Sequence, residues 1–392
     1  FIFLLFFFIG FAEENGLVQF LGDWFLSRKI VHGRPWMLTF ILLFAAFVAG
    51  ALVNELVSIF IFWSIYYSIA KEFGFKPFDK YSTLMICGIA FCGGTAAATT
   101  LPFKLGPLVW LESYTQVTGV DIPYVKYVLF ALPLCVLAVV AYTLIMRFVF
   151  RPDVSALKKI NENFVNTNSL KLNKNQKIAF AFIFLLMVLL LAPSFLPENI
   201  PGVSVLSNLG NAGIMILVIV LMSVVRVEKK PLMDFRKYAK NISWDIYILF
   251  IVVLPLASLL TSDMTGITPA IVQGLSPMLA GRSTLVFAFI VLFSGALLTN
   301  VSNNAVLGIV YINLMCPIAE VMNIDVFPIV AVMMFTIQLA YLTPAASAPA
   351  AMVFSNNKWV KTKDVMKTWA IILPILFIIF FALGMPWANL IF

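Results

Sequence analysis

Long apolar runs dominate the chain, and polar groups fall at regular places between and within them. Crossing the hydrocarbon core of a bilayer takes about 20 apolar residues. Runs of that kind lie at 127–150, 178–196, 211–226, 246–261 and 367–391. The chain also opens on an apolar run, 1–11, which we interpret as the end of a transmembrane helix that begins before Phe1. The pattern predicts a helical protein that crosses a membrane several times.

Four other apolar segments carry polar groups in their middle rather than at their ends. Two of them, 36–73 and 284–322, are nearly twice the length of one span, whereas 81–118 and 326–354 are interrupted by Gly, Pro and small hydroxyl residues. Lipid-exposed backbone cannot leave its hydrogen bonds unmade at membrane depth, so such interruptions must line an enclosed cavity. We therefore expect re-entrant helical hairpins at 36–73 and 284–322 and broken transmembrane helices at 81–118 and 326–354.

Composition and charge agree with a membrane protein. Hydrophobic residues make up 62% of the chain and charged residues 11%, whereas soluble domains carry about 25% charged residues. Soluble enzymes, disordered proteins and nucleic-acid binders are excluded. If the hairpins re-enter, 23 of the 26 Lys and Arg fall on one side of the membrane, in the segments 12–34, 71–80, 147–177, 226–243 and 355–367.

That asymmetry marks the basic side as cytoplasmic and places the C-terminus outside, in a multi-pass protein of the cell membrane. Two full spans per hairpin would leave the loops on the same sides, so charge alone does not decide re-entrance. The four cysteines lie in apolar stretches without metal-type spacing, and His32 is the single histidine. We expect no cofactor beyond a coupling ion.

The two halves of the chain repeat one order of elements. A shift of 248 places Asn54-Glu55 on Ser302-Asn303 and the interrupted helix at Thr95 on that at Thr343. An odd number of crossings separates the copies, so they point in opposite directions, as in secondary transporters. We divide the chain into a first inverted repeat at 1–150, a basic cytoplasmic linker at 151–177 and a second repeat at 178–392. The comparison predicts that the first repeat begins roughly 70 residues upstream of Phe1.

The middle of the second hairpin, LLTNVSNNAVLG, holds Thr299, Asn300, Ser302, Asn303 and Asn304. Asn and Ser both donate and accept hydrogen bonds, so this tip suits a bare cation or a carboxylate. Backbone N–H groups at the start of the returning arm favour an anion. Helix capping is the alternative, because Ser and Asn are ordinary N-caps, but one cap needs one residue. The facing element, 342–354, is either a broken helix with exposed carbonyls or a proline kink.

The first hairpin carries Asn54-Glu55 at its middle. A carboxylate at membrane depth is a functional-site hypothesis by default. Ionised, Glu55 would ligate a cation; neutral, it would carry a proton. Lys104 is either its partner or a contact for the substrate carboxylate. Alternatively, Glu55 caps the returning arm and reaches a basic side chain.

The stretch 281–321, which contains Ser302-Asn303-Asn304, resembles the second hairpin of the divalent anion/sodium symporter family, within the ion transporter superfamily. That family carries Ser-Asn-Thr at each hairpin tip. Its Thr-Pro-Pro-Asn element is similar to PAASAPAAMVF, where Ser347 and Pro349 match, and its Gly-Gly-Thr run is similar to ICGIAFCGGTAAATTLP. The chain departs from the family at Asn54-Glu55-Leu56, Lys104, Ala348 and Ala350.

The resemblance implies a homodimeric elevator-type transporter with one cation site between each hairpin tip and its broken helix. The substrate would lie between the two tips. On this basis we assign substrate binding to Glu55, Asn303, Asn304, Ser347 and Thr95. Cation binding is assigned to Asn54, Glu55, Thr100, Thr299, Ser302, Asn303 and Ala346.

The resulting hypothesis is a cation-coupled symporter of small anions, di- or tricarboxylates first, driven by Na⁺ or alternatively H⁺. A sulfate transporter, or a cation/proton antiporter with Glu55 as the exchanging carboxylate, is the alternative. An intramembrane enzyme is disfavoured, since the sequence has no HExxH motif and no pair of intramembrane Asp residues.

Overall fold

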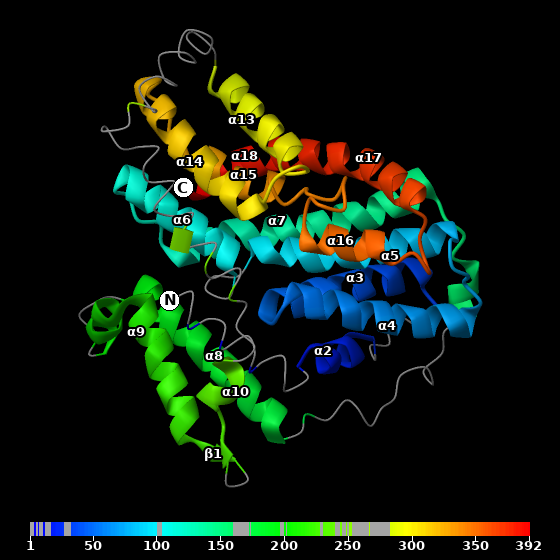
Figure 1. Ribbon diagram of the computed structural model, residues 1–392, viewed down its shortest axis with the longest axis horizontal. Coiled ribbons are helices and arrows are strands. Elements are labelled where there is room, and N and C mark those ends of the chain that lie inside the picture. The colour runs from blue at the N-terminus through cyan, green and yellow to red at the C-terminus, as the bar shows by residue number, and fades with distance from the viewer. Residues whose placement is uncertain are drawn as a thin grey trace.

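The computed structural model is an assembly of helices (Figure 1). It describes residues 17–26, 33–99, 104–159, 174–196, 202–227, 230–239 and 283–392, and isolated positions between them. Among these residues the extended structure is a two-residue antiparallel ladder of β1 (Arg226–Val227) and β2 (Lys230–Pro231). The prediction of an all-α membrane protein is confirmed.

The first half consists of paired and interrupted helices. Their bounds are α2 Leu17–Leu26, α3 Pro35–Leu52, α4 Glu55–Phe73, α5 Lys80–Thr95, α6 Leu105–Thr118 and α7 Tyr124–Ile145, the last extended by a π turn at Met146–Phe150. Pro35 at the first position of α3 fits a helix start, where its missing N–H costs nothing. Gly74 ends α4 with φ 76°, the left-handed conformation that favours glycine.

The second half repeats part of this order. Its helices are α8 Lys174–Phe195, α9 Val203–Val224, α10 Phe235–Ala239, α13 Thr284–Leu298, α14 Asn304–Val321, α15 Phe327–Thr336, α16 Ala348–Ser355, α17 Thr362–Ile379 and α18 Met385–Ile391. A π segment at Phe380–Gly384 joins α17 to α18. The predicted span 246–261 and the opening run 1–11 lie largely outside the described residues.

The apolar helices have the lengths that a membrane demands. Within the described ranges, six are long and apolar enough to cross a bilayer, and α9 adds a seventh if its two parts, bent at Gly210, form one span. The segments 36–73 and 284–322 are each two helices with a break at the predicted polar tip. Because α3 and α4 each reach the length of a span, re-entrance stays a prediction, as does the inverted repeat.

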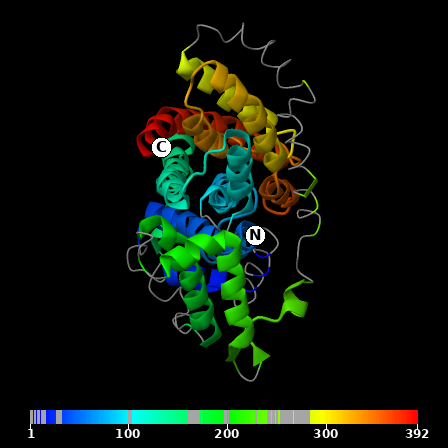
Figure 2. The ribbon, with the colours of Figure 1, turned by 90° about the vertical axis from the view of Figure 1, so that its left-hand side faces the viewer.

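The helices form two regions, visible in Figures 1 and 2. One contains α3–α7 and α13–α18; the other contains α8, α9 and α10, with α8 contacting α7. The turn that joins α3 to α4 and the turn that joins α13 to α14 both lie near the middle of the larger region (Figure 1).

The two halves of the sequence interlock in the larger region. Helix α5 packs on α16, and α6 packs on α14. The Trp110 indole N–H donates to the Ala305 carbonyl at 3.1 Å, and Asn313 Nδ2 donates to Ser113 Oγ at 3.0 Å. Each broken helix of one half is therefore fixed against elements of the other half.

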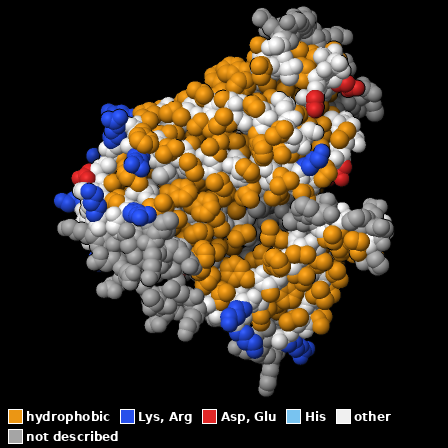
Figure 3. All heavy atoms as spheres, turned by 180° about the vertical axis from the view of Figure 1, so that it is seen from behind, with side chains coloured by type: hydrophobic (Ala, Val, Ile, Leu, Met, Phe, Trp, Pro, Cys, Tyr) orange, Lys and Arg blue, Asp and Glu red, His pale blue; other side chains and the backbone are white. Residues whose placement is uncertain are grey.

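The surface carries its charges at the ends of the helices. The back view shows a broad apolar surface with Lys and Arg mainly at one end and at the foot, and most Asp and Glu at the other end (Figure 3). Helix α7 with its π turn has 27 residues, about 40 Å at 1.5 Å per residue. Exposed Asp121 lies just before this helix and exposed Arg151 just after it, so opposite charges mark its two ends.

Candidate functional site

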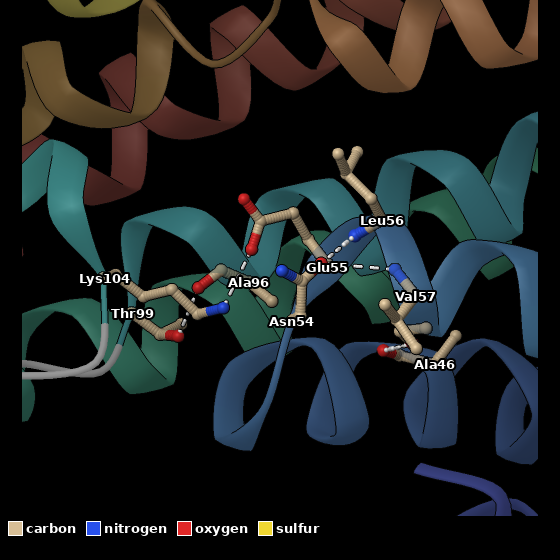
Figure 4. Close-up of polar contacts among 9 residues, drawn as sticks. Ala46, Asn54, Glu55, Leu56, Val57, Ala96, Thr99 and Lys104 are labelled. Atoms are coloured by element: carbon tan, nitrogen blue, oxygen red, sulfur yellow. Dashed lines mark hydrogen bonds and ion pairs between the residues drawn. The ribbon is translucent and has the colours of Figure 1, made fainter. Parts of the chain in front are cut away.

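The tip between α3 and α4 is organised by Asn54. Its backbone is extended, and its side-chain oxygen accepts hydrogen bonds from the N–H groups of Leu56 at 2.8 Å and Val57 at 3.2 Å (Figure 4). Asn54 is therefore the N-cap of α4, which satisfies two of the free N–H groups at that helix start. Asn54, rather than Glu55, therefore caps α4.

Glu55 is the first residue of α4, and its carboxylate reaches across to the broken helix. Lys104 Nζ donates to Glu55 Oε2 at 2.9 Å (Figure 4). The lysine side chain is 4% exposed, whereas that of Glu55 is 31% exposed. The interpretation of Lys104 as the partner of Glu55 is confirmed. A buried ammonium needs such a partner, because an isolated charge removed from water is strongly unfavourable.

The break between α5 and α6 is held by hydrogen bonds to its backbone carbonyls. Helix α5 ends at Thr95, and a 3₁₀ turn, Ala96–Ala98, follows. Thr99 Oγ1 donates to the Ala96 carbonyl at 2.6 Å, and Tyr127 Oη to the Ala98 carbonyl at 2.7 Å. The Thr95 carbonyl accepts the Cys135 Sγ–H at 3.6 Å, from α7. Thr100, assigned to cation binding, lies outside the described residues.

A close approach of α3 and α5 positions the tip on this break. A Cβ added to Gly50 would come within 2.8 Å of the Gly93 carbonyl oxygen, closer than real Cβ atoms come to other atoms. Glycine is therefore required at position 50, where the two helices touch.

The tip between α13 and α14 has the same cap. Asn303 is extended, and its side-chain oxygen accepts from the N–H groups of Ala305 at 3.0 Å and Val306 at 3.2 Å. Its side chain is exposed. Ser302 Oγ donates to the Leu298 carbonyl at 2.8 Å, back into the preceding helix. Capping therefore accounts for one polar residue of this tip and leaves the others free for other roles.

The polar core of the second tip is built around Thr299, which is fully buried. Thr299 Oγ1 lies 2.8 Å from Asn304 Oδ1 and 2.7 Å from the Ile337 carbonyl oxygen. One hydroxyl proton serves only one of these acceptors at a time. Asn304 Nδ2 donates to Gln338 Oε1 at 3.3 Å. The Thr299 hydroxyl, the Asn304 side chain and the Ile337 carbonyl thus bring oxygens together between the tip and the break, and oxygens are the ligands that a hard cation prefers.

The segment between α15 and α16 wraps around this tip. Leu342 N donates to Asn300 Oδ1 at 2.9 Å, and Thr343 Oγ1 to the Asn300 carbonyl at 2.7 Å. Ser347 Oγ donates to the Ala340 carbonyl at 2.7 Å and accepts from Ala350 N at 3.2 Å as the N-cap of α16. Ala346 is buried, and its N–H donates to the Thr343 carbonyl at 3.2 Å.

Equivalent residues of the two tips are separated by one position more than the shift of 248 taken from the sequence. The caps Asn54 and Asn303 are 249 positions apart, as are the first residues of α3 and α13, Pro35 and Thr284. The shift of 248 was therefore wrong at the tips. Glu55 matches Asn304, because each is the first residue of the returning helix.

The assigned residues divide into two groups. At the first tip the structure joins Glu55 to Lys104, while Asn54 caps its own helix; at the second it joins Thr299 and Asn304 to the broken helix. Asn303 and Ser302 bond within their own hairpin, and Thr95 contacts α7. Gln338 was missed by sequence reasoning. Its only signal was a single amide side chain at the end of the apolar run 326–337.

An apolar groove of about 540 Å³ lies beside the second tip, between α13 and α17. Its lining is Phe, Leu, Ile, Ala, Pro and Trp side chains, with Asn300 as the single carboxamide. Such a surface gives an anion few hydrogen-bond donors, so this groove is a poor candidate for an anion site.

Helix pairs with polar tips, packed against interrupted helices, characterise this multi-pass membrane protein. Comparison with known proteins agrees. The chain belongs to the citrate transporter (CitMHS) family, whose sequence profile matches residues 1–311. It is 22% identical over 297 residues to a sodium-dependent dicarboxylate transporter of Staphylococcus saprophyticus. That match covers 72% of this chain and 54% of the relative, so the chain spans about half the length of the curated protein it resembles.

Proposed function

We propose that the protein is a cation-coupled symporter of small carboxylates, di- or tricarboxylates, with Na⁺ as the coupling ion. The observation that supports this most directly is the oxygen cluster of Thr299, Asn304 and the Ile337 carbonyl, held between a hairpin tip and a broken helix. The family supports an organic anion as substrate, and the sodium dependence named for the relative supports Na⁺.

In this proposal the start of α14 attracts the anion, beside the cation that the Thr299 cluster binds. The first N–H groups of a helix carry partial positive charge and attract anions. A cation bound at the Thr299 cluster adds positive charge beside them. In the proposal the cation therefore binds first and raises the affinity for the carboxylate, which is the energetic basis of coupling.

The proposal includes the wider architecture implied by the family resemblance. The halves 1–150 and 178–392 would be inverted repeats joined by the linker 151–177. The hairpins would move with the substrate in an elevator-type cycle within a homodimer. The basic loops would be cytoplasmic and the C-terminus extracytoplasmic.

The test is uptake of labelled citrate and succinate into proteoliposomes, with an inward Na⁺ gradient or an inward proton gradient at matched voltage. We expect Na⁺-driven uptake, and we expect Thr299→Val to abolish it, because valine keeps the shape and removes the oxygen. Thr336→Val is the matched control: Thr336 is also fully buried, but its hydroxyl bonds the Met333 carbonyl of its own helix.

Uptake that follows only the proton gradient would replace Na⁺ by H⁺ and give Glu55 the carrier role. Absence of citrate, succinate and sulfate uptake, together with cation-driven proton efflux, would favour the antiporter. The observation behind that second candidate is the partly exposed Glu55 carboxylate at the first tip.

A further inference from the structure

The two hairpin tips have the same helix positions but different charge. Glu55 and Asn304 are each the first residue of a returning helix, and Lys104 and Ser347 each immediately precede the second part of a broken helix. At the first tip these two positions hold a carboxylate and an ammonium. At the second tip they hold a carboxamide and a hydroxyl.

The ammonium lies where the family resemblance would place a dissociable cation, between the first tip and its broken helix. Lys104 Nζ is 2.9 Å from Glu55 Oε2, and the residue is 3% exposed. Figure 4 shows the lysine side chain extending along the break toward Glu55, beside Ala96, Thr99 and Asn54. The Ala96 carbonyl and the Thr99 hydroxyl, which bond each other at 2.6 Å, lie in the same break, and the covalently attached cation of Lys104 meets the Glu55 carboxylate there.

We propose that the Lys104 ammonium replaces the coupling cation at the first tip, so that only the second tip takes up a dissociable ion. The carboxylate of Glu55 is then neutralised permanently. A tethered charge cannot dissociate into either compartment, so it stabilises the tip without contributing to coupling. The number of cations carried per anion falls by one relative to a carrier with two open sites.

The change in the number of cations carried per anion rests on the proposed function, but the assignment of Lys104 does not. The decisive test therefore measures Na⁺ binding in the absence of substrate. The melting temperature of the purified protein would be followed against NaCl, with choline chloride keeping ionic strength constant. The measurement is made at about pH 8, where a carboxyl group is ordinarily ionised. We expect the wild type to respond with a Hill coefficient of about 1, and Thr299→Val to lose that response.

Removal of the tethered charge should open the first site. We expect Lys104→Ala to gain a second Na⁺ response, with a Hill coefficient rising toward 2, and to be stabilised by methylammonium, which does not stabilise the wild type. The double variant Glu55→Gln/Lys104→Met removes both charges and is the control. It should fold and keep the single response, because no carboxylate remains to hold a cation.

A wild-type Hill coefficient near 2 would overturn the proposal, as would a folded Lys104→Ala protein that gains no response to Na⁺ or methylammonium. If Lys104→Ala does not fold, the wild-type coefficient and the double variant decide. Failure of carboxylate uptake with these binding results intact would remove the proposed function and leave the assignment of Lys104 standing.

Discussion

Asn54 and Asn303 have the same structural role, one at each hairpin tip. Each accepts two backbone N–H hydrogen bonds through its side-chain oxygen, and such a cap is worth about 1 kcal/mol. The amide nitrogen of Asn303 sits on an exposed side chain, so it can still donate to a bound anion.

The two roles of Asn303 can be separated by substitution. Asn303→Ser keeps a capping oxygen, so stability should stay within a few tenths of a kcal/mol of wild type, whereas Asn303→Ala should lose about 1 kcal/mol. We expect both variants to lose carboxylate uptake, since both lack the amide donor. Thermal unfolding and proteoliposome uptake are the measurements. Wild-type uptake by Asn303→Ser would show that the residue acts only as a cap.

Single residues also mark the limit of what the sequence predicts. Glu55 and Lys104 stood out as charges in apolar surroundings, but with 49 positions between them the sequence left two partners open for Lys104, Glu55 or the substrate, and the ion pair in the structure decides for Glu55. Gln338 did not stand out, because one amide near an apolar run is common. Its role depends on the path of 337–347, which folds back on Asn300 and Asn304 through tertiary contacts.

Elements were more predictable than contacts. Polar groups in the middle of the apolar segments marked the breaks near Asn54 and Asn303, because a cap and a helix start have local chemistry. The register between the halves was off by one, since α3 and α13 are apolar almost throughout and therefore offer no polar position that fixes the alignment. The helices that precede the two breaks also differ in length: α5 has 16 residues and α15 has 10. Composition does not predict this difference.

The contact between α6 and α14 gives a prediction at this scale. A Cβ on Gly308 would overlap the indole of Trp110, so Gly308→Leu should separate the helices and cost more than the 1–3 kcal/mol, roughly, of ordinary overpacking. On the same interface Gly106→Ala is the control, because its added Cβ would meet only the far edge of Trp110, at 3.9 Å.

Thermal unfolding of the two purified variants measures the difference. We expect a lower melting temperature and reduced uptake for Gly308→Leu and nearly wild-type behaviour for Gly106→Ala. Equal behaviour of the two variants would mean that the α6–α14 contact does not hold the first broken helix in place.

At the scale of the whole molecule, interlocked halves make the two tips parts of one unit. Helix α5 packs on α16, and Tyr341 Oη donates to the Ala90 carbonyl at 3.3 Å. At the far end of α4, Asn356 Nδ2 donates to Tyr67 Oη at 2.7 Å. Both tips are therefore connected to elements of the other half through packed helices.

The orientation of this unit in the membrane is the remaining prediction. The exposed positions Lys363, in the basic segment 355–367, and Asp121, between α6 and α7, belong to opposite sides in the predicted topology. The four native cysteines are free and buried, so a membrane-impermeant maleimide should report mainly on introduced ones. In intact cells Asp121→Cys should react, and Lys363→Cys should react only after permeabilisation, because basic loops stay cytoplasmic. The reverse labelling pattern would mean that the protein has the opposite orientation, with the α3–α4 pair entering from the outer side of the membrane. Labelling of both positions from the same side would mean that an even number of crossings separates them. That result would contradict the inverted repeat, which needs an odd number.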